Sequence, residues 1–483
     1  MTSSSMHRVI ASVDGAMFTS VRDAPTSRAE RKALGKALRA SVPHKQLGKW
    51  MPGPDRPDPV ALISESHEGR VEHLVGIRVG RMISSPYGFL RGSAVVMADD
   101  VAKLPATGIQ PVVCGDSHLG NFGFYRSPEG EQVIDLNDFD EAHPGGWEWD
   151  LRRLTAAIWV AGRENGMSES DCADAVSECV HAYGDEVALL SEQPLLSRSF
   201  NRLDVERLHD TASEETLRSE IRRAAKIARK RTSDRALPRF TSERDGRRQI
   251  VAEPPLIEPV SPEDFELMGA AIDEYLNTIP PHWRRIVGGY HLLDIAHKVV
   301  GVGSVGLRAY VALLQGSSPD DVLFLQLKQA RRSVLGRYVH GDNAWHAHQG
   351  QRVVEYQQAL QTVSDPLLGW TSIGEHQYYV RQFRNMKGTV PLDSIDARGL
   401  KDYSGIVGHL LAKGHARTSG ASMISGYIGD GDSLAKAFGK FARRYADQTE
   451  ADHAALVAAA KSGAVPVAEG AIEAMGSAFR PGG

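Results

Sequence analysis

Apolar residues follow two different periods along the chain, and the changes between them mark the expected elements. Short apolar runs at 112–114 and 132–136 are typical of buried strands. From residue 151 onward, Leu154, Ile158 and Trp159 recur every three or four positions, which predicts an amphipathic helix. Further helices are predicted over residues 28–40, 171–190, 351–362, 403–416 and 434–460.

Strand-like alternation returns in the second half of the chain. Residues 307–314 and 322–328 flank the turn Gly316-Ser317-Ser318-Pro319-Asp320, and they predict a hairpin. Residues 378–383 predict a later strand. Because these short strands stand between long helical stretches, we expect an α+β fold with a small antiparallel sheet.

Length and composition limit the classes of protein that the chain can be. A chain of 483 residues is too long for one ordinary core. Its formal net charge of −4 is nearly neutral, which argues against nucleic acid or a membrane as the principal partner. The three cysteines, Cys114, Cys172 and Cys179, form no paired framework, and we expect them to be buried. The first residues lack the apolar core of a signal peptide, so we expect a soluble cytoplasmic protein.

The segment 115–140 carries the densest candidate chemistry. Asp116 is followed five residues later by Asn121, and Asp138 and Asp140 come directly after the second expected strand. Phosphoryl-transfer enzymes present a base and their magnesium ligands in this order. Asp116 would orient or deprotonate an acceptor hydroxyl, while Asn121 and Asp138, with Asp140 as a second possibility, would hold Mg²⁺.

Other polar residues of this segment have plainer explanations. Asp135 lies within the strand, where a structural role is expected. His118 is expected to bond nearby backbone, which is the commoner role of such a histidine. Asp150 is expected to cap the following helix or to stand in its first turn.

A glycine-rich segment, Gly301-Val302-Gly303-Ser304-Val305-Gly306, fits the pattern G-x-G-x-x-G. A dinucleotide-binding fold would require a helix directly after these glycines, whereas the expected hairpin is typical of a kinase glycine-rich loop. We therefore assign Gly301, Gly303, Ser304 and Gly306 to nucleotide binding. Lys328 then ends the second hairpin strand, where a phosphate-pairing lysine belongs, and Glu355 on the next helix is its expected partner.

Two further segments resemble functional sites only superficially. His340-Gly341-Asp342-Asn343 has Ala347 five residues beyond its aspartate and no flanking strand. His340, His346 and His348 lack a regular metal-binding spacing, so a surface loop is favoured. The basic run 222–248 is interpreted as a helix that leads into an exposed linker.

The sequence resembles the bacterial family called domain of unknown function 2252 from about residue 60 to 460. The resemblance rests on segments in combination, namely 85–92, 114–118, 137–141, 147–150, the Gly301 loop, 325–328 and 445–448. The catalytic segment is also similar to aminoglycoside and choline kinases, which carry His-Gly-Asp-x-His-x-x-Asn and Asp-Phe-Asp/Glu motifs in this order. Cys114 stands where those motifs begin with histidine.

The resemblance implies a two-lobed protein-kinase-like fold whose parts are circularly permuted, because the glycine loop follows the catalytic loop. We expect four parts: an amino-terminal arm (1–60), the first part of a helical lobe with the catalytic loop (61–285), a nucleotide-binding lobe (286–390) and the second part of the helical lobe (391–483). The chain would then be an ATP- and Mg²⁺-dependent phosphotransferase with Asp116, Lys328 and Glu355 as catalytic residues. Its acceptor would be a hydroxyl compound, more readily a small molecule than a protein.

Three alternatives remain open at this point. The same fold would serve a nucleotide-binding pseudokinase or an enzyme that transfers AMP. A binding or scaffold protein would use the basic segment 222–248 to recruit an acidic partner. A metal hydrolase would use His118 and the aspartates, but it would leave the glycine loop and Lys328 without a role.

Overall fold

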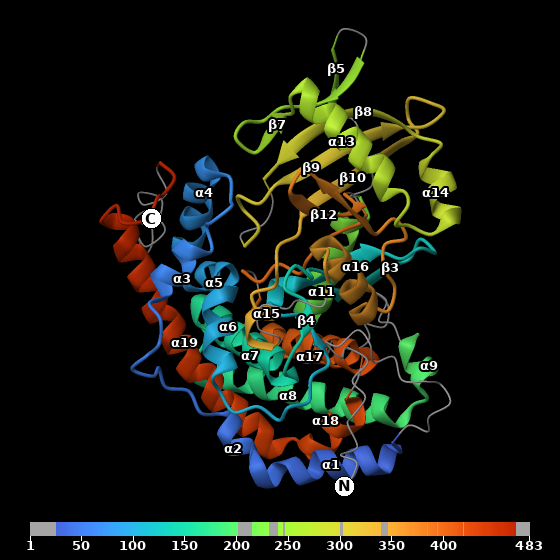
Figure 1. Ribbon diagram of the computed structural model, residues 1–483. Helices are drawn as coiled ribbons and strands as arrows, with labels where there is room; N and C mark the ends of the chain where they lie inside the picture. Colours follow the sequence, from blue (N-terminus) through green and yellow to red (C-terminus); the bar gives the residue numbers. More distant parts are fainter. Residues whose placement is uncertain are drawn as a thin grey trace.

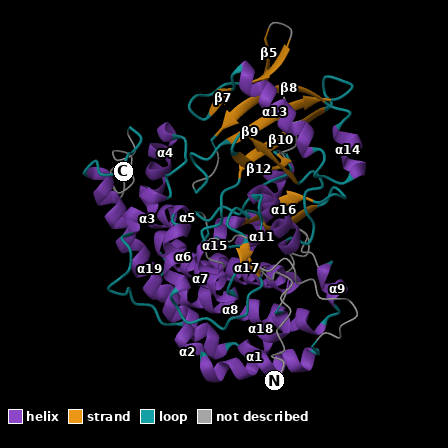
Figure 2. Ribbon diagram, in the orientation of Figure 1, coloured by secondary structure: helices purple, strands orange, loops and turns teal. Residues whose placement is uncertain are grey.

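The computed structural model describes residues 26–200, 215–230, 240–244, 247–299, 303–339, 346–383, 385–393, 395–418 and 420–469. Most strands gather at one end of the molecule and most helices form a body below them (Figure 1, Figure 2). The mixed α+β class is confirmed. Among the described residues, no helix combines the length and the apolar character needed to cross a membrane.

The sheet at the top of Figure 1 has six antiparallel strands in the order β11-β12-β10-β9-β8-β7. Their bounds are β7 Ile257–Pro259, β8 His291–Lys298, β9 Ala309–Gln315, β10 Val322–Gln329, β11 Gly369–Ile373 and β12 His376–Gln382. The expected hairpin is therefore confirmed as β9 and β10, which pair from Val322 opposite Gln315 to Lys328 opposite Ala309.

Alternation along β10 decides where Lys328 points. Leu325 and Leu327 enter a cluster that also holds Tyr275 of α13 (Pro262–Tyr275). Phe324 belongs to a different cluster on the other face of the sheet. Because side chains of a strand alternate between faces, Lys328 lies on the face of Phe324 and away from α13. The nucleotide-binding lobe was expected to begin at residue 286. The sheet and its covering helix begin earlier in the sequence, because β7 and α13 come before that residue.

The helical body combines segments from both sides of the sheet segment in the sequence. Helices α7 (Trp147–Glu164) and α8 (Glu169–Glu192) pack against α17 (Ala397–Thr418) and α19 (Asp432–Lys461). Leu154 and Ile158 of α7 are completely buried, as their spacing predicts. The helices around the sheet and this body include α14 (Pro281–Val287), α16 (Gln349–Leu360) and the short α15 (Gly336–Val339).

Smaller elements complete the body. A wall beside the candidate site is built from α3 (Pro59–Glu65), α4 (Glu72–Ile83), α5 (Pro86–Gly92) and α6 (Ala94–Ala102). Three two-stranded sheets lie outside the large sheet in the described part of the chain. They pair β1 (Val112–Val113) with β4 (His143–Pro144), β2 (Phe122–Arg126) with β3 (Gln132–Leu136), and β5 (Thr241–Arg244) with β6 (Arg247–Ile250). Further helices are the 3₁₀ turn η1 (Leu119–Asn121), α9 (Leu195–Ser199), α11 (Glu215–Arg229) and α18 (Ala421–Ile428).

Two expectations about the organisation require correction. The described part of 1–60 is not an arm outside the core, because α1 (Arg28–Ser41) packs on α18 and α2 (His44–Leu47) packs on α19. Leu47 is fully buried. The basic run 222–248 begins as the expected helix α11, but its later part contains the β5–β6 hairpin where an exposed linker was expected. In both places apolar residues supply enough burial to order a segment that looks polar as a whole.

Candidate active site

The loop that carries Asp116 is fixed by helix α7. The carboxylate of Asp150, in the first turn of α7 as expected, accepts hydrogen bonds from the backbone N–H groups of Cys114 (2.6 Å) and Gly115 (2.9 Å). Gly115 has φ of +80°, and a Cβ there would lie 2.3 Å from the carbonyl oxygen of Glu141. Only glycine fits such a turn, so local backbone requirements set the direction of Asp116.

Asp116 has a partner that the sequence did not reveal. Arg153 of α7 donates from Nε to Asp116 Oδ1 over 2.9 Å, and its Nη2 lies 2.7 Å from the same oxygen. Burial raises the pKa of Asp116, while the charge of Arg153 offsets part of that rise. Arg153 lies one turn after Asp150. Its place on a helical face that was expected to be buried was the one sign in the sequence that it needs an acidic partner.

Asn121 and His118 lie on either side of the same turn. Asn121 donates from Nδ2 to the carbonyl oxygen of Asp116 over 2.6 Å, so its amide braces the loop and also lines the cavity. His118 accepts a hydrogen bond from the N–H of Gly120 at Nδ1 over 3.1 Å. Burial and the charges of Arg91 and Arg153 lower the pKa of His118 well below its usual value. The expected bond of His118 to nearby backbone is confirmed, and its ring also lines the cavity with Nε2 3.9 Å from Asp116 Oδ2.

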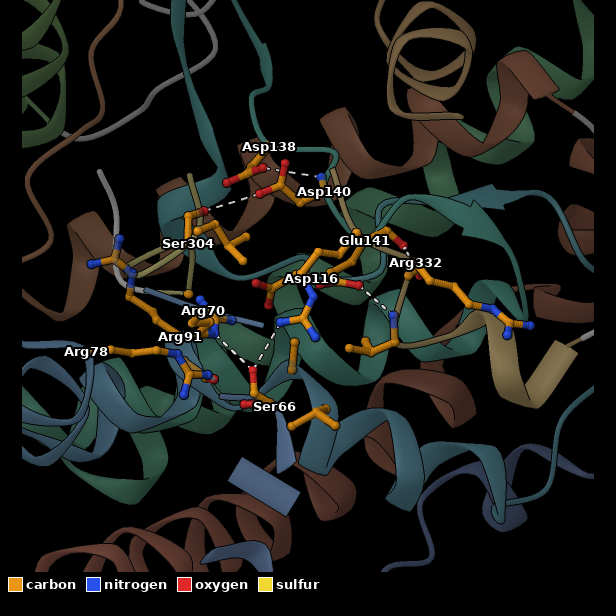
Figure 3. A pocket seen from close by; sticks show the side chains of 18 of the residues that line it. Ser66, Arg70, Arg78, Arg91, Asp116, Asp138, Asp140, Glu141, Ser304 and Arg332 are labelled. Atoms are coloured by element: carbon orange, nitrogen blue, oxygen red, sulfur yellow. Dashed lines mark hydrogen bonds between the residues drawn. The ribbon is translucent and has the colours of Figure 1, made fainter. Parts of the chain in front are cut away.

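The second acidic segment meets Lys328 although about 190 residues separate them in sequence. Lys328 Nζ lies 3.8 Å from Asp138 Oδ1 and forms an ion pair with Asp140. Asp140 also accepts hydrogen bonds from Tyr379 (3.0 Å) and from Ser304 (3.2 Å). Figure 3 shows Asp138, Asp140 and Ser304 together at one side of the cavity.

The two aspartates differ in charge environment. Burial raises the pKa of Asp138, and the neighbouring Asp140 raises it further. For Asp140, burial acts in the same direction, but the Lys328 ammonium and the bonds from Lys328 and Tyr379 outweigh it and hold the pKa below its usual value. Burial lowers the pKa of Lys328, yet the two carboxylates outweigh burial and raise it. Asp138 is therefore the carboxylate with the least neutralised charge.

The glycine-rich segment lies beside this pair where it is described. Gly303 and Ser304 line the cavity, and the carbonyl oxygen of Gly306 accepts a hydrogen bond from the N–H of Val71 over 2.8 Å. Gly301 lies outside the described residues. The segment joins β8 to β9, so Lys328 stands on the third strand of this series.

Glu355 does not pair with Lys328 in the described structure, which corrects that expectation. Its carboxylate bonds His346 Nε2 over 2.6 Å and accepts from Gln351 Nε2 over 2.8 Å. Asp140 takes the place beside the lysine that Glu355 was expected to fill. The sequence could not reveal this, because the position of Glu355 in a helix does not show which neighbour its carboxylate will contact. Gln351, four residues earlier on the same face of α16, competes with any partner from another element.

Asp135 is directed away from the cavity, in agreement with the expected structural role. Lys413 of α17 lies 2.7 Å from Asp135 Oδ2, and both side chains are buried. Cys114, Cys172 and Cys179 are buried free thiols, as expected. His348 caps α16 by accepting from the N–H of Gln351 at 3.1 Å, whereas 340–343 lie outside the described residues.

Asp138 and Asn121 line the cavity and carry oxygen atoms of the kind that hard cations prefer. Among the described residues, no group of three or more histidines, cysteines or carboxylates is arranged to hold a metal. A zinc-like resident site normally needs such a group. Mg²⁺ takes one or two carboxylates and completes its shell with water and phosphate oxygens. Asp138 and Asn121, which both line the cavity, could supply one carboxylate and one amide oxygen for such an ion, whereas both oxygens of Asp140 are already engaged.

These side chains open onto a cavity of about 460 Å³. That volume lies in the range of small-molecule sites. Asp116, Asn121, Asp138 and Asp140 line one part, and several arginines line another. The described part of the basic run 222–248 contributes no lining residue.

A family model described as an uncharacterized protein conserved in bacteria (DUF2252) matches residues 70–459. The chain belongs to this family. No curated protein and no solved structure matches the chain. The matched region includes Asp116, Asn121, Asp138, Asp140 and Lys328, whereas the cavity-lining residues Glu65, Ser66 and Glu68 lie before it.

Proposed function

We propose that this DUF2252 protein is an ATP- and Mg²⁺-dependent phosphotransferase with a two-lobed, circularly permuted kinase-like fold. The observation that carries the proposal is the approach of Lys328 Nζ to Asp138 (3.8 Å) and its ion pair with Asp140. Protein kinases likewise place a lysine on the second strand after their glycine-rich loop, and they hold magnesium with an aspartate that follows the catalytic loop.

Each residue has a distinct role in the proposed site. Lys328 and the backbone of Gly303 and Ser304 would bind the phosphates of ATP, and Asp140 would hold the lysine in place. Asp138 and Asn121 would hold Mg²⁺, and that ion would supply positive charge to stabilise the charge that develops on the phosphate oxygens. The acceptor hydroxyl would lie against Asp116.

The proposed reaction balances without any further reactant. The acceptor oxygen forms a bond to the terminal phosphorus, the bond between that phosphorus and the bridging oxygen breaks, and ADP leaves. The acceptor proton goes to Asp116, whose raised pKa favours proton uptake. Arg153 fixes the direction of the carboxylate over 2.9 Å.

A test compares two cavity-lining acids. The Asp138→Ala variant should lose Mg²⁺-dependent conversion of ATP to ADP by about a hundredfold or more, because no other carboxylate of the pair is free for the ion. Glu68→Gln, which changes an exposed lining residue, serves as the matched control and should keep the activity. Folding of both variants is checked by circular dichroism. Retained turnover in Asp138→Ala would overturn the proposal.

A second candidate on the same fold is supported by one contact. Lys328 is bonded to Asp140 and not to Glu355, so the lysine of a protein-kinase active state is partnered differently here. An AMP-transferring enzyme or a pseudokinase would tolerate this difference. Products carrying AMP would indicate the former, and nucleotide binding without turnover would indicate the latter.

A further inference from the structure

Four arginines form a group on the side of the cavity away from Asp138 and Asp140. This arginine cluster consists of Arg70 before α4, Arg78 in α4, Arg91 in α5 and Arg331 after β10. Figure 3 shows Arg70, Arg78 and Arg91 gathered together, with the Asp138–Asp140 pair at the opposite side. Residues far apart in sequence thus bring like charges to one wall.

The hydrogen bonds of the cluster go to backbone and not to acids. Arg70 donates to the carbonyl oxygens of Ser66 (3.0 Å) and Val305 (2.6 Å), and Arg331 donates to the same Ser66 oxygen (3.2 Å). Arg78 donates from Nη2 to the carbonyl oxygen of Gly92 (2.8 Å). Within the described ranges, none of the four forms an ion pair with a carboxylate.

Donors remain unused where burial is deepest. The side chain of Arg78 is in a residue only 2% exposed, and its Nε and Nη1 have no hydrogen-bond partner among the described residues. The Nε of Arg91 is equally buried and without a partner in that part of the chain. A buried guanidinium without an acceptor is costly. An anionic ligand that accepts these bonds removes the cost.

Electrostatic effects in the surroundings agree with this geometry. Burial and the charge of Arg331 lower the pKa of Arg70 to about 10, although Glu141 and Asp140 offset part of the effect. Burial, Arg70 and Arg331 lower the pKa of Arg78. Burial and the charges of Arg78 and Arg70 lower the pKa of His67 to about 4. The wall therefore repels protons and attracts anions.

We propose that the arginine cluster binds a phosphate or carboxylate group of the acceptor, so that the second substrate is an anionic hydroxyl compound. This assignment rests on the proposed phosphotransferase function. Arg91, Asp116 and His118 line the same cavity. An acceptor whose hydroxyl lies at Asp116 would therefore reach the cluster with another group of the same molecule. Guanidinium groups bind phosphate and carboxylate through paired N–H donors.

The test measures thermal unfolding with inorganic phosphate as the probe, without Mg²⁺ or nucleotide. Phosphate should raise the Tm of the wild-type protein, and the rise should grow with the logarithm of phosphate concentration once that concentration exceeds the dissociation constant. In Arg91→Gln the apparent affinity should fall roughly tenfold or more, since a charged donor is removed. Arg337→Gln is the matched control, because Arg337 lines the same cavity but lies 3.8 Å from Glu65 and is half exposed. If Arg91→Gln does not fold, Arg331→Gln takes its place.

A second arm identifies the source of the anion. With AMP-PNP and Mg²⁺ at saturation, the phosphate-dependent rise in Tm should persist, because the cluster would serve the acceptor. Loss of the rise would show that the arginines hold the nucleotide's own phosphates and would overturn the acceptor assignment. No rise in the wild-type protein, or an equal rise in Arg91→Gln, would overturn the anion site itself.

The two proposals fail in distinguishable ways. Asp138→Ala should lose ATP turnover but keep the response to phosphate, because Asp138 lies opposite the cluster. If AMP-PNP gives no stabilisation while phosphate does, the phosphotransferase proposal and the acceptor assignment both fall, and the anion site remains.

Discussion

Two aspartates separated by a single residue show how closely chemistry depends on contacts. Asp140 bonds Lys328, Tyr379 and Ser304, so its charge is compensated within the protein. The side chain of Asp138 is 38% exposed and lies 3.8 Å from the same lysine. The Asp-Phe-Asp pattern identified both residues as candidate metal ligands. Only their surroundings show that Asp140 is the partner of Lys328 and that Asp138 is the more exposed carboxylate.

His67 reports on the positive wall at the scale of one residue. Its folded pKa of about 4 lies below the usual 6.5 because of burial first, and then because of Arg78 and Arg70. A depressed pKa means that the unfolded chain takes up the proton first. The stability contributed by neutral His67 is therefore complete above pH 6.5 and is lost as the pH falls toward 4.

We expect His67→Gln to flatten the fall in stability between pH 6.5 and 4. The effect should be about 1–2 kcal/mol, discounted for solvent screening because the ring is only half buried. Urea unfolding at several pH values measures it, and His282→Gln, at an exposed position, is the control. An unchanged pH dependence in His67→Gln would contradict the positive field described for this wall.

At the scale of elements, helix α7 organises the loop that carries Asp116. Asp150 receives hydrogen bonds from two backbone N–H groups of that loop and lies 3.1 Å from His415 Nε2 of α17. His415 Nδ1 in turn bonds the hydroxyl of Tyr183 in α8. One carboxylate on α7 therefore joins the loop to α17 and, through His415, to α8, although 265 residues separate Asp150 from His415.

Asp150→Ala should destabilise the protein by about 3–5 kcal/mol, because it leaves buried donors without an acceptor. Amide hydrogen exchange at Cys114 and Gly115 should accelerate more than exchange in α19, since those two N–H groups lose their partner. Asp174→Ala, at an exposed position on α8, is the control. Equal protection of the loop in the variant would show that other contacts fix it.

At the scale of the whole molecule, the first described helix packs on a helix from the last quarter of the sequence. Helix α1 lies against α18 at the bottom of Figure 1. A Cβ at Gly35 would lie 1.9 Å from the carbonyl oxygen of Met423, and one at Gly426 would lie 2.1 Å from that of Lys32. Backbone therefore meets backbone at both points, and no side chain fits between them.

Gly426→Ala should consequently separate α1 from the body. We expect a loss of about 1–3 kcal/mol in stability, as for other overpacked sites, together with faster protease cleavage within 28–41. Gly439→Ala on α19 is the matched control, because a Cβ there meets nothing within 4 Å. That change should be neutral or stabilising, since alanine favours a helix. Unchanged cleavage in Gly426→Ala would show that α1 does not depend on this contact.

The amino-acid sequence determined the local features. Periodicity predicted α7, α8, α16, α17 and the β9–β10 hairpin because helices and strands bury side chains at fixed intervals. It also identified the cavity residues Asp116, Asn121, Asp138 and Ser304, together with Lys328, which contacts the lining aspartates, because their chemical types are rare in combination.

Only the tertiary structure decided which groups are partners. It paired Asp116 with Arg153 and Lys328 with Asp140, and it turned Glu355 toward His346. It also assembled Arg70, Arg78, Arg91 and Arg331 into one wall. The physical reason is that local propensity depends on neighbours in sequence, whereas charge pairing and burial depend on distances in space. Those distances are fixed only when every element is packed together.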